Sequence, residues 1–128
     1  MKLGESLEDY LETLLVLEAS GHIRCVDVAR LMNVSKPSVN KAMNVLKEKG
    51  FVTQQVYGEI HLTESGRALA KEIYNRHQIV KGFLVHVLGV SESTAEEDAC
   101  HIEHVISKET FDLMTKYYKE KMWHIWTR

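Results

Sequence analysis

The amino-acid sequence predicts a mainly α-helical fold that is interrupted once by a small region of β-structure. Through most of the 128 residues, apolar side chains recur at intervals of three and four, which is the spacing of one buried helix face. Only one proline, Pro37, occurs in the chain, and no repeat or low-complexity stretch is present. The period changes over 51–62, where we expect two short strands.

The first helix is expected over about 6–19. Ser6 followed by Asp9 is the pattern of a capping box, in which two side chains satisfy free amides at a helix start. A stripe of leucines gives this helix an apolar face: Leu7, Leu11, Leu14 and Leu15. Gly21 then ends it.

A pair of helices joined by a tight turn follows. A short helix fits 25–32, and residues 33–35 form the turn. The next helix begins with Ser35 as its N-cap and Pro37 in its first turn, and it stops at Gly50. Such a turn holds two helices at an angle and leaves the second one free to enter a DNA groove.

Two strands, 51–56 and 59–62, are expected to form a hairpin around Tyr57 and Gly58. Three helices and then a hairpin is the order of elements in a winged helix-turn-helix. We therefore predict a winged helix-turn-helix DNA-binding domain over 1–63.

The remainder, 64–128, is expected to be all helical. A long helix fits about 64–87, a second begins at Ser91 or Ser93, and a last one covers about 109–123.

Charge is distributed unevenly along a chain whose net charge is −2. Residues 1–20 carry one lysine and five acidic residues, whereas residues 21–60 carry six basic and three acidic ones. A basic middle segment suits contact with phosphate on one face only. No apolar run approaches the roughly 20 residues that cross a bilayer, and residues 1–20 do not resemble a signal peptide. We expect no membrane partner and a reducing cytoplasmic location, with a Cys25–Cys100 disulfide as the less favoured alternative.

The predicted DNA-contacting side chains lie at the start of the third helix and on the hairpin. They are Lys36, Pro37, Ser38, Asn40, Lys41, Gln54 and Tyr57. For any single lysine, the alternative is a charge that simply solvates an exposed helix. The order of the elements together with the local charge favours DNA binding for the segment as a whole.

A second constellation lies in the run DACHIEHVIS. If the run is helical, Cys100, Glu103 and His104 project from one face, and a thiolate, a carboxylate and an imidazole then meet at one point. These are ligand types for a divalent transition metal. The alternative is a solvated helix face with one buried cysteine.

Three further candidate ligands lie on other helices. Asp9 and Glu12 are three residues apart on the first helix, and His77 lies on the long helix. Each also has a structural explanation: a capping residue, a surface acid and a core histidine.

At this point the chain resembles a known family, the metal-dependent transcriptional repressors typified by the diphtheria toxin repressor and the manganese transport regulator. The resemblance rests on Ser6-Leu7-Glu8-Asp9-Tyr10-Leu11, Leu62-Thr63-Glu64-Ser65-Gly66, Arg76-His77 and Cys100-His101-Ile102-Glu103-His104. It implies a homodimer and a metal site between the DNA-binding and dimerisation domains. It also implies that metal loading makes the protein bind operators and repress metal-uptake genes. It also implies the metal ligands Asp9, Glu12, His77, Cys100, Glu103 and His104.

The chain departs from both branches of that family. Manganese-type members have aspartate at Asp9 and glutamate at Cys100, whereas iron-type members have methionine and cysteine; this chain takes one from each. Iron-type members also have a glutamate at Lys81 and a histidine at Glu96, so we do not expect their second site in that form. The resemblance implies a sensor of Mn²⁺ or Fe²⁺, with Co²⁺, Ni²⁺ or Zn²⁺ binding in vitro.

Alternatives of other classes remain. A winged-helix regulator could sense an organic ligand or thiol oxidation at Cys100 without metal. An enzyme with Cys100 as nucleophile and His104 as base is disfavoured, because the sequence shows no motif for an oxyanion hole and no glycine-rich phosphate-binding loop. We therefore expect no catalytic residues and no organic small-molecule substrate. A third alternative is an interaction module anchored by Trp123 and Trp126.

Overall fold

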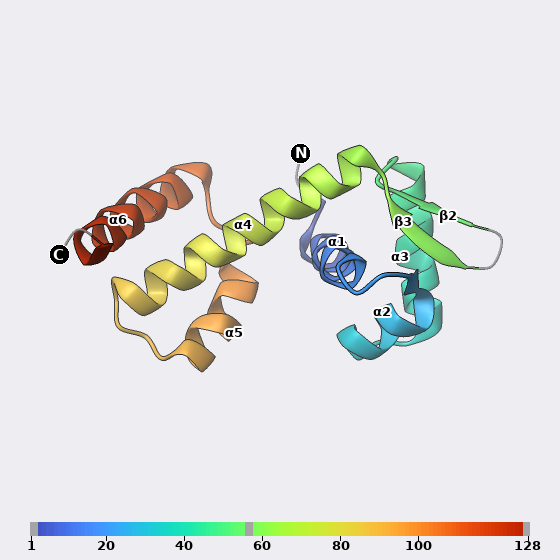
Figure 1. Ribbon diagram of the computed structural model, residues 1–128, viewed down its shortest axis with the longest axis horizontal. Helices are drawn as coiled ribbons and strands as arrows, with labels where there is room; N and C mark the ends of the chain where they lie inside the picture. The colour runs from blue at the N-terminus through green and yellow to red at the C-terminus, as the bar shows by residue number, and fades with distance from the viewer. Residues whose placement is uncertain (1–2, 56–57, 127–128) are drawn as a thin grey trace. The chain divides into compact units, whose positions relative to one another are not determined.

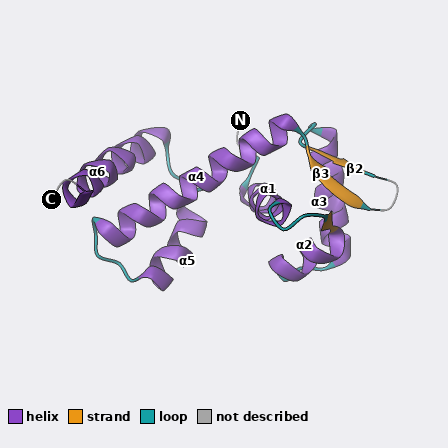
Figure 2. Ribbon diagram, viewed as in Figure 1, coloured by secondary structure: helices purple, strands orange, loops and turns teal. Residues whose placement is uncertain are grey.

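The computed structural model describes residues 3–55 and 58–126. The chain divides into two compact units, Met1–Glu72 and Ile73–Arg128, each of which is described by itself. Helices account for most of the described residues, and the strands form one small sheet (Figures 1 and 2). The predicted fold class, a winged helix-turn-helix followed by an all-helical region, is confirmed.

The first unit contains three helices, a small sheet and the start of a fourth helix. In chain order its elements are α1 (Glu5–Glu18), β1 (Ile23–Arg24), α2 (Cys25–Met32), α3 (Lys36–Glu48), β2 (Val52–Gln54) and β3 (Glu59–Leu62). The sheet is antiparallel with the order β1-β3-β2, so β3 lies in the centre. In its register Val52 faces Leu62 and Ile23 faces Ile60.

The core of this unit lies where α1, α2 and α3 meet the sheet. Its most completely buried side chains are Leu11, Leu14, Val28, Val39, Met43, Leu46 and Ile60. Each contributes about 1.5–3 kcal/mol when it leaves water. This packing makes α1 and α3 parts of one body.

The turn between α2 and α3 has the predicted chemistry. Asn33 has a left-handed backbone with φ of 56°, a conformation that asparagine tolerates better than most residues. The Ser35 hydroxyl accepts from the Ser38 amide, and Pro37 lies in the first turn of α3. The predicted N-cap of α3 is therefore confirmed.

Two predictions at the ends of elements are wrong. The N-cap of α1 is Gly4 rather than Ser6, without a side-chain cap, so the expected capping box with Asp9 does not form. The expected strand 51–56 is seen as Val52–Gln54, without Phe51 and Gln55, while Val56 and Tyr57, a predicted DNA contact, lie outside the described residues. In addition, β1 was not predicted, because two residues are too few to show a period.

The helix α4 (Glu64–His86) begins in the first unit and continues into the second. Its first turn is held against the end of α3: the hydroxyls of Thr63 and Ser65 both donate to the Gly50 carbonyl, at 2.7 and 3.1 Å. Gly66 lies in the same turn. A Cβ at this position would stand 1.9 Å from the Phe51 carbonyl oxygen, so only glycine fits without movement of the backbone.

The second unit packs α5 (Glu92–Ile102) and α6 (Lys108–Trp126) against α4. Its core is formed by Val80, Leu84, Ala95 and Ala99, with Phe83, Ile102, Phe111 and Met114 packed around them. Gly82 lets α4 approach α6 closely, since a Cβ there would lie 2.5 Å from the Tyr118 ring. No helix of the described residues combines the length and the apolar character that a bilayer crossing requires.

Candidate metal centre and DNA-reading surface

Helices α4 and α5 bring together His77, Glu96 and Cys100 in the second unit. One ligand atom from each lies within 4.8 Å of the others. Glu96 and Cys100 are four residues apart on α5 and therefore share a face of that helix. An imidazole nitrogen, a carboxylate oxygen and a thiolate sulfur together form half or more of the first shell of a divalent transition metal.

Both ring nitrogens of His77 contact carboxylates. Nδ1 lies 2.8 Å from Glu103 Oε2, and Nε2 lies 3.0 and 3.1 Å from the two oxygens of Glu96. The hydrogen bond to Glu103, opposed in part by burial and reinforced by Glu96, raises the pKa of His77 to about 9. The imidazole is therefore protonated at neutral pH when no metal is bound.

Lys81 places a second cation beside Glu96. Its Nζ lies 3.1 Å from Glu96 Oε2, so Glu96 is held between an imidazolium and an ammonium. Partial burial would raise the pKa of Glu96, but the hydrogen bonds from His77 and Lys81 outweigh it, and the pKa lies below its usual value. Glu96 is thus ionised and ready to act as a ligand.

Glu103 is the most deeply buried acid of this unit, with 1% of its surface exposed. Burial opposes ionisation, yet the contacts with His104 and His77 lower the pKa of its carboxyl below the usual value. His104 Nε2 lies 3.2 Å from Oε1. Among the described residues Oε1 has no hydrogen bond of good geometry. A buried carboxylate oxygen with a lone pair to spare fits a metal ligand.

Cys100, Glu103 and His104 were expected to share one face of a helix, but the helix ends before Glu103 and His104. α5 stops at Ile102, Glu103 is its C-cap and His104 lies in the following turn. Cys100 is instead grouped with Glu96, one turn earlier. Glu96 is therefore the candidate ligand that sequence reasoning left out of its set. Its spacing of four residues before Cys100 is the signal that could have included it.

The remaining predicted ligands, Asp9 and Glu12, lie on α1 in the first unit. Both are half-buried, and their spacing of three residues places them on one side of α1. Their membership in a metal site stays a prediction.

The start of α3 presents an exposed surface with the predicted composition. Lys36, Pro37, Ser38, Asn40 and Lys41 are all exposed, whereas the opposite face of the helix is buried in the core. This is what a recognition helix requires: one face holds it to the domain and the other is free to meet base edges and phosphates. Gln54, on β2, is half-buried and already hydrogen-bonded within the protein.

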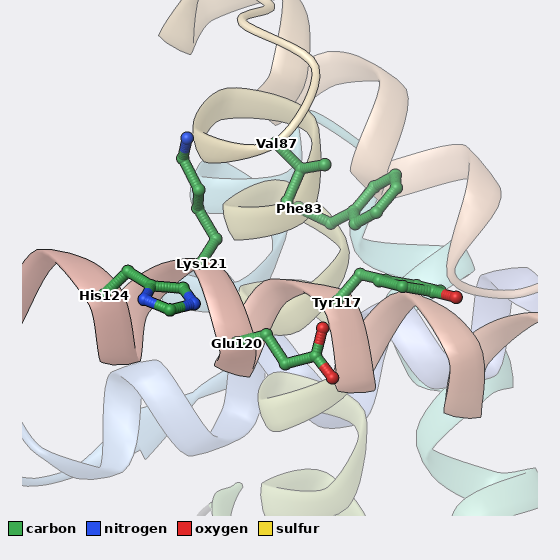
Figure 3. A pocket seen from close by; sticks show the side chains of 6 residues that line it. All are labelled: Phe83, Val87, Tyr117, Glu120, Lys121 and His124. Atoms are coloured by element: carbon green, nitrogen blue, oxygen red, sulfur yellow. The ribbon is translucent and has the colours of Figure 1, made fainter.

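The second unit also has a shallow groove of about 430 Å³ between α4 and α6. Figure 3 shows Phe83 of α4 and Val87, the residue directly after α4, facing Tyr117 of α6, with three polar residues along the groove: Glu120, Lys121 and His124. An exposed apolar surface of this kind is typical of a protein interface.

Two family domains match the chain. The N-terminal DNA-binding domain of iron-dependent repressors matches residues 2–60, and their metal-binding and dimerisation domain matches residues 63–121. An HTH-type transcriptional regulator of Methanocaldococcus jannaschii is 37% identical over 93% of this chain and 96% of that protein. The transcriptional regulator MntR of Salmonella typhimurium is 39% identical over 91% of this chain and 74% of that protein. The chain therefore belongs to the iron-dependent repressor family of metal-dependent transcriptional regulators.

Solved structures agree with this assignment. The metal-dependent transcriptional regulator MtsR has a TM-score of 0.79 and 27% identity, over 88% of this chain and 53% of that one. A manganese-dependent transcriptional repressor in complex with manganese has a TM-score of 0.77 and 25% identity, over 88% and 52% of the two chains. The chain thus spans about half the length of these solved relatives.

Proposed function

We propose that this chain is a metal-activated repressor that binds operator DNA as a homodimer and controls manganese or iron homeostasis. The observation that carries the proposal is the grouping of His77, Glu96 and Cys100, ligand types of a transition metal, in the unit that matches a metal-binding domain. The exposed start of α3, in the unit that matches a DNA-binding domain, supplies the reading surface.

The proposed ligand set is Asp9, Glu12, His77, Cys100, Glu103 and His104, with Glu96 added from the structure. A bound divalent cation would supply concentrated positive charge, and it would require its ligands in a defined geometry. The carboxylates among these residues provide hard oxygen ligands for Mn²⁺ or Fe²⁺, while the Cys100 thiolate adds preference for Fe²⁺, Co²⁺ or Zn²⁺. Relatives named as manganese regulators support Mn²⁺ as one physiological candidate.

The path from metal to DNA is proposed to run through α1. Asp9 and Glu12 lie on α1, and α1 packs directly against α2 and α3. If both carboxylates serve a metal whose other ligands belong to the second unit, the placement of α3 becomes dependent on metal. In a homodimer this favours the arrangement in which two α3 helices match half-sites about 34 Å apart.

Several finer properties belong to the same proposal. We infer that the protein is not an enzyme, acts in the cytoplasm, and binds neither membrane nor an organic substrate. The division into domains 1–63 and 64–128 also stays a prediction beside the compact units Met1–Glu72 and Ile73–Arg128.

The test is fluorescence anisotropy with a labelled operator selected from promoter DNA, titrated with Mn²⁺, Fe²⁺, Co²⁺, Ni²⁺ and Zn²⁺ and reversed with EDTA. We expect DNA binding to require metal and EDTA to release the DNA, whereas an oxidation sensor would keep its DNA. The variant Asp9→Ala should remain dimeric by light scattering and lose metal-stimulated binding.

The matched control is Glu5→Ala, which removes an exposed acid from the same helix. It should bind like the wild type. Full metal-stimulated binding by Asp9→Ala would contradict the proposed role of α1.

A further inference from the structure

Cys25, the first residue of α2, lies between the recognition helix and the wing. Its Sγ is 3.4 Å from Asn40 Oδ1 on α3 and 3.6 Å from Gln54 Nε2 on β2. The thiol therefore donates to one side-chain amide and accepts from another. Neither contact is strong alone, but together they join three elements of the DNA-binding unit through one sulfur atom.

Asn40 lies on the exposed face of α3 near its start, and its side-chain amide has the chemistry to read a base. An asparagine amide recognises adenine in the major groove when its carbonyl accepts from N6 and its amine donates to N7. This requires one defined orientation of the amide group, because a 180° rotation about the last side-chain bond exchanges the positions of its oxygen and nitrogen. The donor at Cys25 selects the orientation in which Oδ1 faces α2, and the second lone pair of Oδ1 is left for a base.

Both polar atoms of the Gln54 side chain have hydrogen-bond partners within the protein. Its Nε2 donates to Cys25 Sγ and to the Gly58 carbonyl at 3.4 Å, and its Oε1 accepts from Lys47 Nζ at 3.2 Å. Gln54 thus connects the hairpin to α3 at Lys47 and to α2 at Cys25. Because these hydrogen bonds engage both polar atoms of Gln54, they favour a role in positioning the wing rather than in direct contact with a base.

We propose that Cys25 is a positioning residue for sequence-specific DNA binding: it sets the amide of Asn40 for base readout and, through Gln54, ties the wing to the recognition helix. The inference rests on the proposed function, since it assumes that α3 reads DNA. It predicts that a residue without a hydrogen-bonding side chain at position 25 reduces discrimination between base pairs. The affinity that arises from phosphate contacts should be retained.

The first test is selection of binding sites from randomised duplex DNA with Mn²⁺ present. It compares the wild type, Asn40→Ala, Cys25→Ala, Cys25→Ser and the control Val26→Ala, an exposed neighbour on α2. Asn40→Ala should lower the preference at its base pair by about tenfold. Cys25→Ala should lower preference at that same base pair by roughly threefold, as expected for one lost hydrogen bond. Cys25→Ser should restore it, because a hydroxyl also donates and accepts.

The second test needs no DNA. In the metal-free full chain, the side-chain ¹⁵N amide signals of Asn40 and Gln54 should both shift in Cys25→Ala and remain in place in Val26→Ala. Unchanged signals would overturn the proposal, and so would a Cys25→Ala variant with wild-type base preference or with an equal loss at all sequences. A wild-type chain that enriches no sequence at all would instead refute the proposed function.

Discussion

At the scale of single residues, His77 determines how protons and metal ions compete. Its two nitrogens contact Glu103 and Glu96, and these carboxylates hold a proton on the ring up to a pKa of about 9. A metal can bind the ring only at a nitrogen that has lost its proton. The same two carboxylates therefore hold the proton and are candidates to hold the metal.

The pH dependence of metal affinity follows from this competition. Because the pKa of His77 is raised, the ring is protonated at pH 7 and becomes neutral as pH rises toward 9. We expect Mn²⁺ affinity to rise about tenfold per pH unit for each displaced proton and to level off near pH 9. Electron paramagnetic resonance of free Mn²⁺ between pH 6.5 and 9 measures this slope.

The control for this prediction is Glu96→Gln, which removes one of the two charges that favour the protonated ring. In the metal-free variant, the pKa of His77 measured by NMR should be lower than in the wild type. An affinity that is constant from pH 7 to 8.5 would show that no His77 proton is displaced.

The sequence predicted which residues could be metal ligands more readily than it predicted which of them lie together. The sequence indicated His77, Cys100, Glu103 and His104 as ligand types, and the structure places all four in one unit. The spacing of four residues between Glu96 and Cys100 could have indicated their pairing, but nothing in the sequence indicated that α5 ends before Glu103 and His104. Helix ends are set by local capping and by packing, and Ile102 is followed by no glycine or proline that marks a stop.

At the scale of elements, α3 packs into the core with one face and leaves the other face exposed for the proposed contact with DNA. Val39, Met43 and Leu46 hold it in the core, while Lys36 and Lys41 remain exposed. Ser35 and Pro37 made the start of this helix predictable, because both act within one turn. The start of α1 was mispredicted, since Gly4 precedes Glu5 and no side chain caps the helix.

The exposed face of α3 leads to a prediction about salt. Lys41→Ala should weaken binding to all DNA sequences alike and reduce the slope of log affinity against log salt by about one per recognition helix, because one phosphate contact is lost. Lys49→Ala, at the opposite end of α3, is the matched control and should keep the wild-type slope. A gel-shift series from low to high salt measures both; equal slopes for Lys41→Ala and wild type would place Lys41 away from DNA.

At the scale of the whole molecule, the sequence predicted the order of elements and the class of protein. Short-range signals sufficed for this, since periodicity, caps and turns lie within a few residues of each other. The ligand set of a metal centre depends on contacts between helices that are distant in sequence, such as His77 with Glu103. Sequence patterns within one helix cannot report such contacts.

If metal controls DNA binding, thermodynamic linkage requires DNA to control metal binding. Operator DNA should raise the affinity of the dimer for Mn²⁺ by the same factor by which Mn²⁺ raises affinity for the operator. Isothermal titration of Mn²⁺ into the protein, with operator and with a scrambled duplex of equal length, measures the factor. Equal Mn²⁺ affinity with both duplexes would contradict coupling through specific DNA binding.

The contact between Gly66 and Phe51 has a consequence for how this protein can vary. The first turn of α4 touches the backbone beyond α3 at a position where any residue other than glycine would force the backbone to move. A random-mutagenesis screen should therefore tolerate many residues at the adjacent exposed Glu64 and almost none at Gly66. In this chain we therefore expect position 64 to vary freely and position 66 to stay glycine.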